Sequence, residues 1–192
     1  MSSCGCEINN KCKQEIDALD IQEHLVTGND IVKNAFDCKT WYCHKQTLTP
    51  SYQSPEMTNV TAEYKLDKNN VVQIKNCGKR ADGTQECVSF LRGTLPCGET
   101  KAKFTVKPWF VPSCLVRDTN YWIVDQSDKH MIVSAGNPTL SDENCKRKPE
   151  YGQGLWILTN SSVRDETVIN NAVKKINDIG INGEDMVDIT HK

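Results

Sequence analysis

The sequence predicts a mainly β protein in which about eight short strands form an antiparallel meander and one amphipathic helix follows them. Apolar and polar residues alternate with a period of two in short segments spread between positions 37 and 160. Short polar turns separate these segments at regular spacing. One later segment, residues 162–180, instead keeps a strong helical period. A meander of this kind closes into a barrel or folds into a sandwich.

We expect residues 1–36 to form an arm that packs on the β structure. Residues 1–12 hold three cysteines and show no apolar periodicity, which predicts an irregular segment tied down by disulfides. The segment 14–36 carries apolar residues at helical spacing, and Thr27-Gly28-Asn29 interrupts that pattern. Residues 37–192 then form the main body, so we interpret the chain as a single domain with an N-terminal arm.

Each predicted strand is an alternating segment or a short apolar run between turn signals. Asp82-Gly83 is the turn signal of a hairpin that joins two of these strands. The predicted strands are the segment around Trp41 and residues 60–67, 70–76, 88–93, 101–107, 120–125, 130–136 and 154–160.

The predicted helix has recognisable ends. Ser162-Val163-Arg164-Asp165 resembles a capping box at its start, and Gly180 occupies the place of a C′ glycine. Its apolar face consists of Val168, Ile169, Ala172, Val173, Ile176 and Ile179. A short final strand is expected within residues 186–190.

Composition limits the functional classes. The chain has 192 residues and a net charge of −2. Its basic residues are scattered, which argues against a nucleic-acid partner. No apolar run is long enough for a transmembrane helix. The start, MSSCGCEINNK, is not a signal peptide, so we expect a mature chain whose leader has been removed.

The ten cysteines favour an oxidising compartment, either outside the cell or in the lumen of an organelle. Two sequons make Asn59 and Asn160 candidates for glycosylation, in agreement with secretion. All ten cysteines are disulfide candidates because the paired spacing of zinc knuckles is absent. They are Cys4, Cys6, Cys12, Cys38, Cys43, Cys77, Cys87, Cys97, Cys114 and Cys145.

Spacing restricts some disulfide pairings. Cys38 and Cys43 are an odd number of residues apart and face opposite sides of a strand, so each is expected to bond a different partner. Cys77 and Cys87 lie almost symmetrically about the Asp82-Gly83 turn, which predicts a bridge across the hairpin. The other pairings stay open.

The order of these motifs resembles the lipocalins from Phe36 to Thr190. KTWY (39–42) looks like the first-strand signature of that family. TAEYKLDKNNVVQIKNCG (61–78) is similar to the second and third strands of bacterial and apolipoprotein D-like members. NYWIVDQSDKHMIVSAGNP and LWILTNSSVRDE are similar to later strands and to the start of the flanking helix. A weaker likeness connects the chain with the lipocalin domain of plant violaxanthin de-epoxidases.

The resemblance implies an eight-stranded antiparallel up-and-down barrel with a C-terminal flanking α-helix and a disulfide-tied N-terminal helical arm. It also places Trp41 at the packed base of the barrel. Two positions depart from the family pattern: Lys39 replaces the signature glycine, and Asn160 stands where many members have an arginine over the tryptophan. These departures put the usual closure of the base in doubt.

Alternation indicates which side chains face the inside of such a barrel. An eight-stranded barrel either fills with side chains or holds one small ligand. The predicted ligand-binding residues are Ala62, Tyr64, Leu66, Ile74, Phe90, Phe104, Val106, Trp122 and Met131.

The resulting hypothesis is a carrier that transports or sequesters a small hydrophobic molecule such as a fatty acid, lipid, sterol, retinoid or carotenoid-type pigment. A peripheral membrane contact during ligand exchange and a homo-oligomer are left open. No motif for a metal or another cofactor stands out, and no catalytic residue is assigned. Two alternatives remain: a lumenal enzyme of the de-epoxidase type, and a protein-binding module with a filled barrel.

Overall fold

A computed structural model describes residues 21–27, 37–47, 53, 56–67, 71–94, 101–110, 119–138, 140–141, 147–148 and 154–192. The predictions for the cysteine-rich arm 1–12 lie outside these residues. So do the disulfide predictions for Cys4, Cys6, Cys12, Cys97, Cys114 and Cys145, and the side chain of Cys38. Of the segment 14–36, the described part is residues 21–27, in which η1 (Ile21–His24) is a short 3₁₀ helix.

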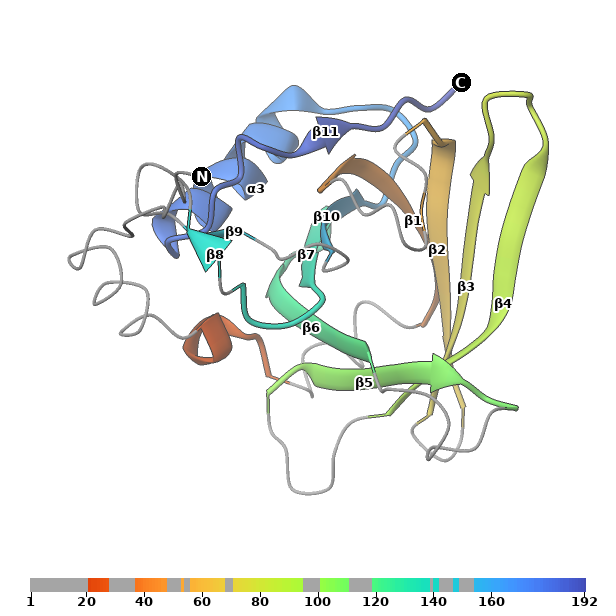
Figure 1. The fold of residues 1–192 in the computed structure, drawn as a ribbon, viewed down its shortest axis with the longest axis horizontal. Helices are drawn as coiled ribbons and strands as arrows, with labels where there is room; N and C mark the ends of the chain where they lie inside the picture. The colour runs from red at the N-terminus through yellow and green to blue at the C-terminus, as the bar shows by residue number, and fades with distance from the viewer. Residues whose placement is uncertain are drawn as a thin grey trace, which may run out of the picture.

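Eight antiparallel strands close into a barrel, as predicted. Each strand pairs with the next along the chain, and β10 returns to pair with β1. Figure 1 shows the strands arranged around the barrel interior. They are β1 (Asp37–Gln46), β2 (Thr58–Leu66), β3 (Val72–Lys79), β4 (Gln85–Thr94), β5 (Lys103–Pro108), β6 (Thr119–Gln126), β7 (His130–Ser134) and β10 (Leu155–Thr159).

The remaining elements lie outside this ring. Helix α3 (Glu166–Asp178) follows β10, and the short β11 (Val187–Asp188) pairs with Lys45 and Gln46 at the end of β1 (Figure 1). The sequence predicted both elements. It did not predict the two-residue strands β8 (Leu140–Ser141) and β9 (Arg147–Lys148), which pair with each other.

The barrel wall separates two hydrophobic clusters. The inner cluster includes Trp41, Tyr64 and Phe104. The outer cluster joins the apolar face of α3 and Ile21 of η1 to outward-facing strand residues such as Ile157. Alternation along each strand produces this division, because successive side chains point to opposite faces of the sheet. The helix therefore stabilises the barrel by burying the part of the outer wall that β6, β7 and β10 form.

The ends of α3 are fixed by local hydrogen bonds. The Asp165 carboxylate accepts hydrogen bonds from the backbone N–H groups of Thr167 and Val168, so Asp165 is the N-cap. The predicted capping box that began at Ser162 is therefore wrong. Gly180 adopts a φ of 82°, as its predicted role at C′ requires. The backbone N–H of Ile181 then reaches the carbonyl of Ile176, which completes a Schellman motif.

The barrel closes despite the two departures from the family pattern. Strands β1 and β10 pair from Tyr42↔Thr159 to Gln46↔Trp156. The side chain of Asn160 donates a 2.7 Å hydrogen bond to the carbonyl of Asp128. Arg164 donates to the carbonyl of His44 and forms an ion pair with Asp188, which ties the segment after β10 to β1 and β11.

Candidate functional site

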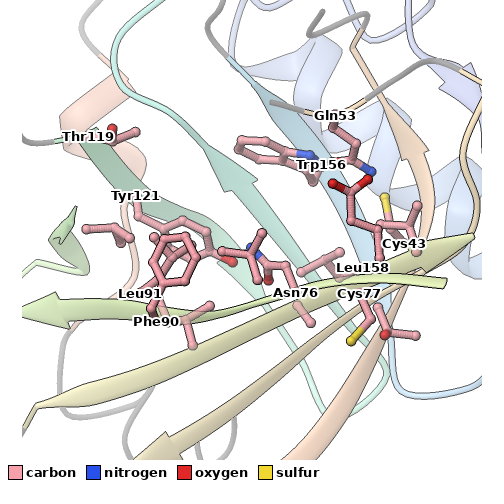
Figure 2. A pocket seen from close by; sticks show the side chains of 18 of the residues that line it. Cys43, Gln53, Asn76, Cys77, Phe90, Leu91, Thr119, Tyr121, Trp156 and Leu158 are labelled. Carbon is pink, nitrogen blue, oxygen red and sulfur yellow. The ribbon is translucent and has the colours of Figure 1, made fainter. Parts of the chain in front are cut away.

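The barrel interior contains a cavity of about 490 Å³. Figure 2 shows side chains from opposite walls converging on it, with Trp156, Gln53 and Cys43 toward one end and Tyr121, Phe90 and Leu91 toward the other. Apolar groups make up most of its surface. A cavity of this size and character lies within the range of small-molecule sites, roughly 300–1,000 Å³.

The nine predicted ligand-binding residues differ in where they lie relative to the cavity. Ala62, Ile74, Phe90 and Val106 line the cavity. Tyr64, Phe104 and Met131 belong to the buried inner cluster beside it. Leu66 is partly buried against that cluster. Trp122 is in the outer cluster instead.

The prediction that Trp122 faces the barrel interior is wrong. In the β5–β6 register, Tyr121 is the residue opposite the inward-facing Phe104, so the next side chain points outward. Trp122 packs in the outer cluster, where the ammonium group of Lys103 lies 5.3 Å from its ring centroid. Tyr121 takes the position in the cavity wall.

Phe90 lines the cavity but remains 37% exposed. The β3–β4 register shifts between Ile74↔Leu91 and Asn76↔Val88, so one extra residue of β4 lies between the two pairs. This bulge changes the phase of the strand. Val88 and Leu91 both line the cavity as a result, and Phe90 lies where the cavity meets the surface.

Several cavity residues were not predicted: Cys43, Asn76, Leu91, Tyr121, Trp156 and Leu158. Phasing GLWILTN by alternation would have found two of them, since Trp156 and Leu158 share one face of β10 while Leu155 and Ile157 pack in the outer cluster. The sequence carries no comparable signal for Leu91, because its orientation depends on the bulge.

Trp41 is 1% exposed and belongs to the inner cluster, without lining the cavity. Cys43, two residues later, is a buried free thiol that lines the cavity. The prediction that Cys43 is disulfide-bonded is therefore wrong. Burial raises the pKa of its thiol far above the ordinary value, so the group stays neutral. The predicted bridge between Cys77 and Cys87 is confirmed.

Two tyrosines place their hydroxyl groups together beside the cavity. The hydroxyl groups of Tyr64 and Tyr121 are hydrogen-bonded to each other. Burial raises the pKa of both phenols, so both stay protonated at neutral pH. The ring of Tyr121 also stacks on Trp156, with centroids 6.4 Å apart. These contacts fix the aromatic wall and leave it uncharged.

An exposed aromatic cluster lies at the rim of the cavity. We call Phe90, Trp109 and Phe110 the rim aromatics. Trp109 is 60% and Phe110 57% exposed, and the rings of Phe90 and Phe110 are 5.2 Å apart. The Arg92 guanidinium lies 5.5 Å from the centroid of the Trp109 ring. An exposed cluster of this kind is characteristic of a contact surface.

A second hollow, of about 680 Å³, lies on the outside of the barrel beside β1 and the C-terminal segment. It contains His44 and His191, whose ring centroids are 4.8 Å apart. Each Nε2 lies within hydrogen-bond distance of a backbone carbonyl, that of Ser161 for His44 and that of Cys43 for His191. Burial lowers the pKa of His44. His44 thus connects β1 to the segment that follows β10, and His191 connects the C-terminal end of the chain to β1.

The described residues contain no group of three or more histidine, cysteine, aspartate or glutamate side chains able to hold a metal ion. In the same part of the chain, no helix is long and apolar enough to cross a membrane. Two carboxylates of the barrel strands have partners of their own: Glu63 pairs with Lys75, and Asp125 pairs with His130.

The glycosylation candidates differ in their surroundings. Asn59 is half-buried in β2, and its side-chain oxygen accepts a hydrogen bond from the backbone N–H of Lys192. Asn160 is exposed.

Solved structures show which fold class this barrel represents. Apocrustacyanin C2 matches with a TM-score of 0.58 at 16% identity, covering 81% of this chain and 77% of that chain. H1 crustacyanin from the lobster Homarus americanus gives 0.58 at 15% identity, covering 87% of this chain and 86% of that one. The cockroach allergen Per a 4 gives 0.57 at 18% identity, covering 86% and 90%.

A siderocalin, Ex-FABP, matches with a TM-score of 0.51 at 9% identity, over 81% of this chain and 94% of that one. These likenesses establish the lipocalin fold for this chain, as the resemblance of its motifs implied. No family model matches the sequence. The search of curated proteins found no match either.

Proposed function

We propose that this protein is a carrier that binds one small hydrophobic molecule inside its barrel. The observation that carries the proposal is the cavity of about 490 Å³ with a mainly apolar lining inside a closed wall. Fold neighbours support it, since one of them is a siderocalin described as acting through dual ligand specificities. Transfer of apolar surface from water drives such binding, at about 25 cal/mol per Å² before the entropic costs of association.

Blocking the cavity tests this function. Val88 lines the cavity from β4 and is partly exposed, so a larger side chain has room to enter the cavity without displacing the fully buried core. We expect Val88→Trp to weaken binding of an apolar fluorescent probe at least tenfold while the barrel stays folded. Val163→Trp is the matched control, because Val163 is 76% exposed and lines no part of this cavity. Equal affinity in the two variants would contradict binding inside the barrel.

Ligand exchange at a membrane surface is part of the same proposal. The rim aromatics connect the cavity to the outside through Phe90, and Arg92 lies next to Trp109. Tryptophan and phenylalanine insert readily into the headgroup region of bilayers, and a neighbouring arginine favours anionic lipids. We expect the protein to cosediment with anionic vesicles and expect Trp109→Ala/Phe110→Ala to lose this binding. Concentration-dependent dimers that the same double variant abolishes would point to a homo-oligomer instead.

The proposed location is extracellular or in the lumen of an oxidising organelle. The Cys77–Cys87 bridge supports this location because disulfides persist in oxidising compartments. Asn59 and Asn160 remain proposed glycosylation sites, and the greater exposure of Asn160 makes it the more accessible acceptor. Intact-mass analysis before and after removal of N-glycans measures the occupancy of both sites.

A further inference from the structure

The cavity has an unused hydrogen-bond donor at one end. The side-chain amide nitrogen of Gln53 is buried and has no hydrogen-bond partner. Gln53 lines the cavity and lies beside Trp156 at the end shown in Figure 2. A buried amide N–H without a partner loses its hydrogen bonds to water and gains none in return, so native proteins usually supply a partner.

A second orphan amide lies near the same end. Gln46 is fully buried, and its Nε2 has no partner either. Its side-chain oxygen is 4.0 Å from the Sγ of Cys43, and Cys43 lines the cavity. Gln46 is also the β1 residue that pairs with Trp156. Two of the three orphan side-chain atoms among the described residues are thus amide nitrogens around this one end.

The surroundings of this end favour a neutral partner. The nearby thiol of Cys43 is uncharged because burial raises its pKa. Among the described residues, the charged side chains that line the cavity are Glu86, which pairs with Arg80, and Lys107 of β5. Lys107 belongs to β5, four strands away from β1 around the barrel wall, so among the described residues it does not accompany the amides of Gln53 and Gln46. A carboxylate at this end would lack a compensating cation among these residues, and an uncompensated buried charge is expensive.

We infer that the Gln53 end of the cavity is a polar subsite that receives a neutral oxygen, a carbonyl or hydroxyl group, at one end of an otherwise apolar ligand. This inference rests on the proposed carrier function and narrows its ligand class. The amide N–H of Gln53 donates to the ligand oxygen. Apolar residues such as Leu91, Phe90 and Ile74 contact the hydrocarbon part. The subsite thereby selects oxygenated apolar molecules over plain hydrocarbons and over carboxylates.

Affinities for a matched ligand series test this inference. The series presents a hydrocarbon, a ketone, an alcohol and a carboxylate on one long carbon skeleton, each competing with a bound fluorescent probe. In the wild type we expect the ketone and the alcohol to bind about five- to tenfold more tightly than the hydrocarbon, as one added hydrogen bond implies. The carboxylate should gain no such advantage.

Gln53→Leu removes the donor and should abolish the preference while hydrocarbon affinity is kept. Gln53→Asn, which keeps an amide but shortens its reach, should weaken the preference. Gln73→Leu is the matched control, since Gln73 is exposed on β3 and lies outside the cavity. The same affinity ratios in wild type and Gln53→Leu would overturn the subsite and leave the carrier function standing. Failure of all four compounds to bind the wild type would overturn both.

Discussion

At the scale of single residues, Cys43 is a strand residue of the barrel wall whose free thiol lines the cavity. Its thiol is fully buried, and burial raises its pKa because a thiolate would lose its solvation there. Alkylation requires the thiolate, so we expect Cys43 to resist iodoacetamide in the native protein at mildly alkaline pH and to react once the protein is unfolded. Peptide mapping by mass spectrometry reports on this cysteine separately from the other nine. Rapid labelling of native Cys43 would contradict its burial.

The pair of Asp125 and His130 makes a contribution to stability that depends on pH. Its carboxylate lies 2.8 Å from Nε2 of His130, and that hydrogen bond lowers the pKa of Asp125 below 3.8. A carboxyl whose folded pKa is depressed stabilises the fold above its unfolded pKa, and this contribution disappears as the pH falls through the folded value.

We therefore expect Asp125→Asn to lower the free energy of unfolding by about 1 kcal/mol at neutral pH. The difference from wild type should vanish well below pH 3.8. Urea unfolding of both proteins, at neutral pH and at a pH well below 3.8, measures this difference in the free energy of unfolding. A difference that stays constant with pH would show that the lost interaction does not depend on the carboxylate charge.

At the scale of elements, the β3–β4 hairpin is held by a covalent link. Cys77 and Cys87 are direct cross-strand partners, and Gly83 in the turn has a φ of 84° that favours glycine. The disulfide limits the unfolded chain across a separation of 10 residues. We expect Cys77→Ala/Cys87→Ala to lower the free energy of unfolding by about 2–4 kcal/mol, measured by urea denaturation.

Lys79→Ala/Gln85→Ala provides the control for this hairpin. These residues are also cross-strand partners near the turn, and no covalent bond joins them. This double variant should change the free energy of unfolding by less than about 0.5 kcal/mol, as exposed substitutions usually do. An equal loss in both double variants would mean that hairpin packing, rather than the disulfide, accounts for the effect.

The strands and the helix could be predicted from the sequence because each has a clear period and a clear turn signal. Tyr121 and Trp122 show where this reasoning stops. They are adjacent aromatic residues in one strand. Which of them faces the barrel interior depends on the register of β6 with β5, and the residue type of either one does not reveal it. Leu91 likewise enters the cavity through a bulge that the alternation of β4 does not indicate.

At the scale of the whole molecule, eight strands close into a barrel, and helix α3 buries part of the outer face of the wall. Alternation alone left a barrel and a sandwich as equal alternatives, and the ordered motifs decided between them. Gln53 could not have been assigned from the sequence, because it lies between strands and its importance comes from an unpaired amide inside a cavity. The proposed carrier function therefore depends on the closed barrel together with the cavity inside it.

Native mass spectrometry of the protein purified from its own source, followed by organic extraction, tests the central claim most directly. We predict a mass increment for one bound molecule that disappears on denaturation, and an extract that contains a mainly apolar compound with a neutral oxygen at one end. A mass without any bound molecule, together with no binding of fatty acids, retinoids or carotenoids to the purified protein, would contradict the carrier function.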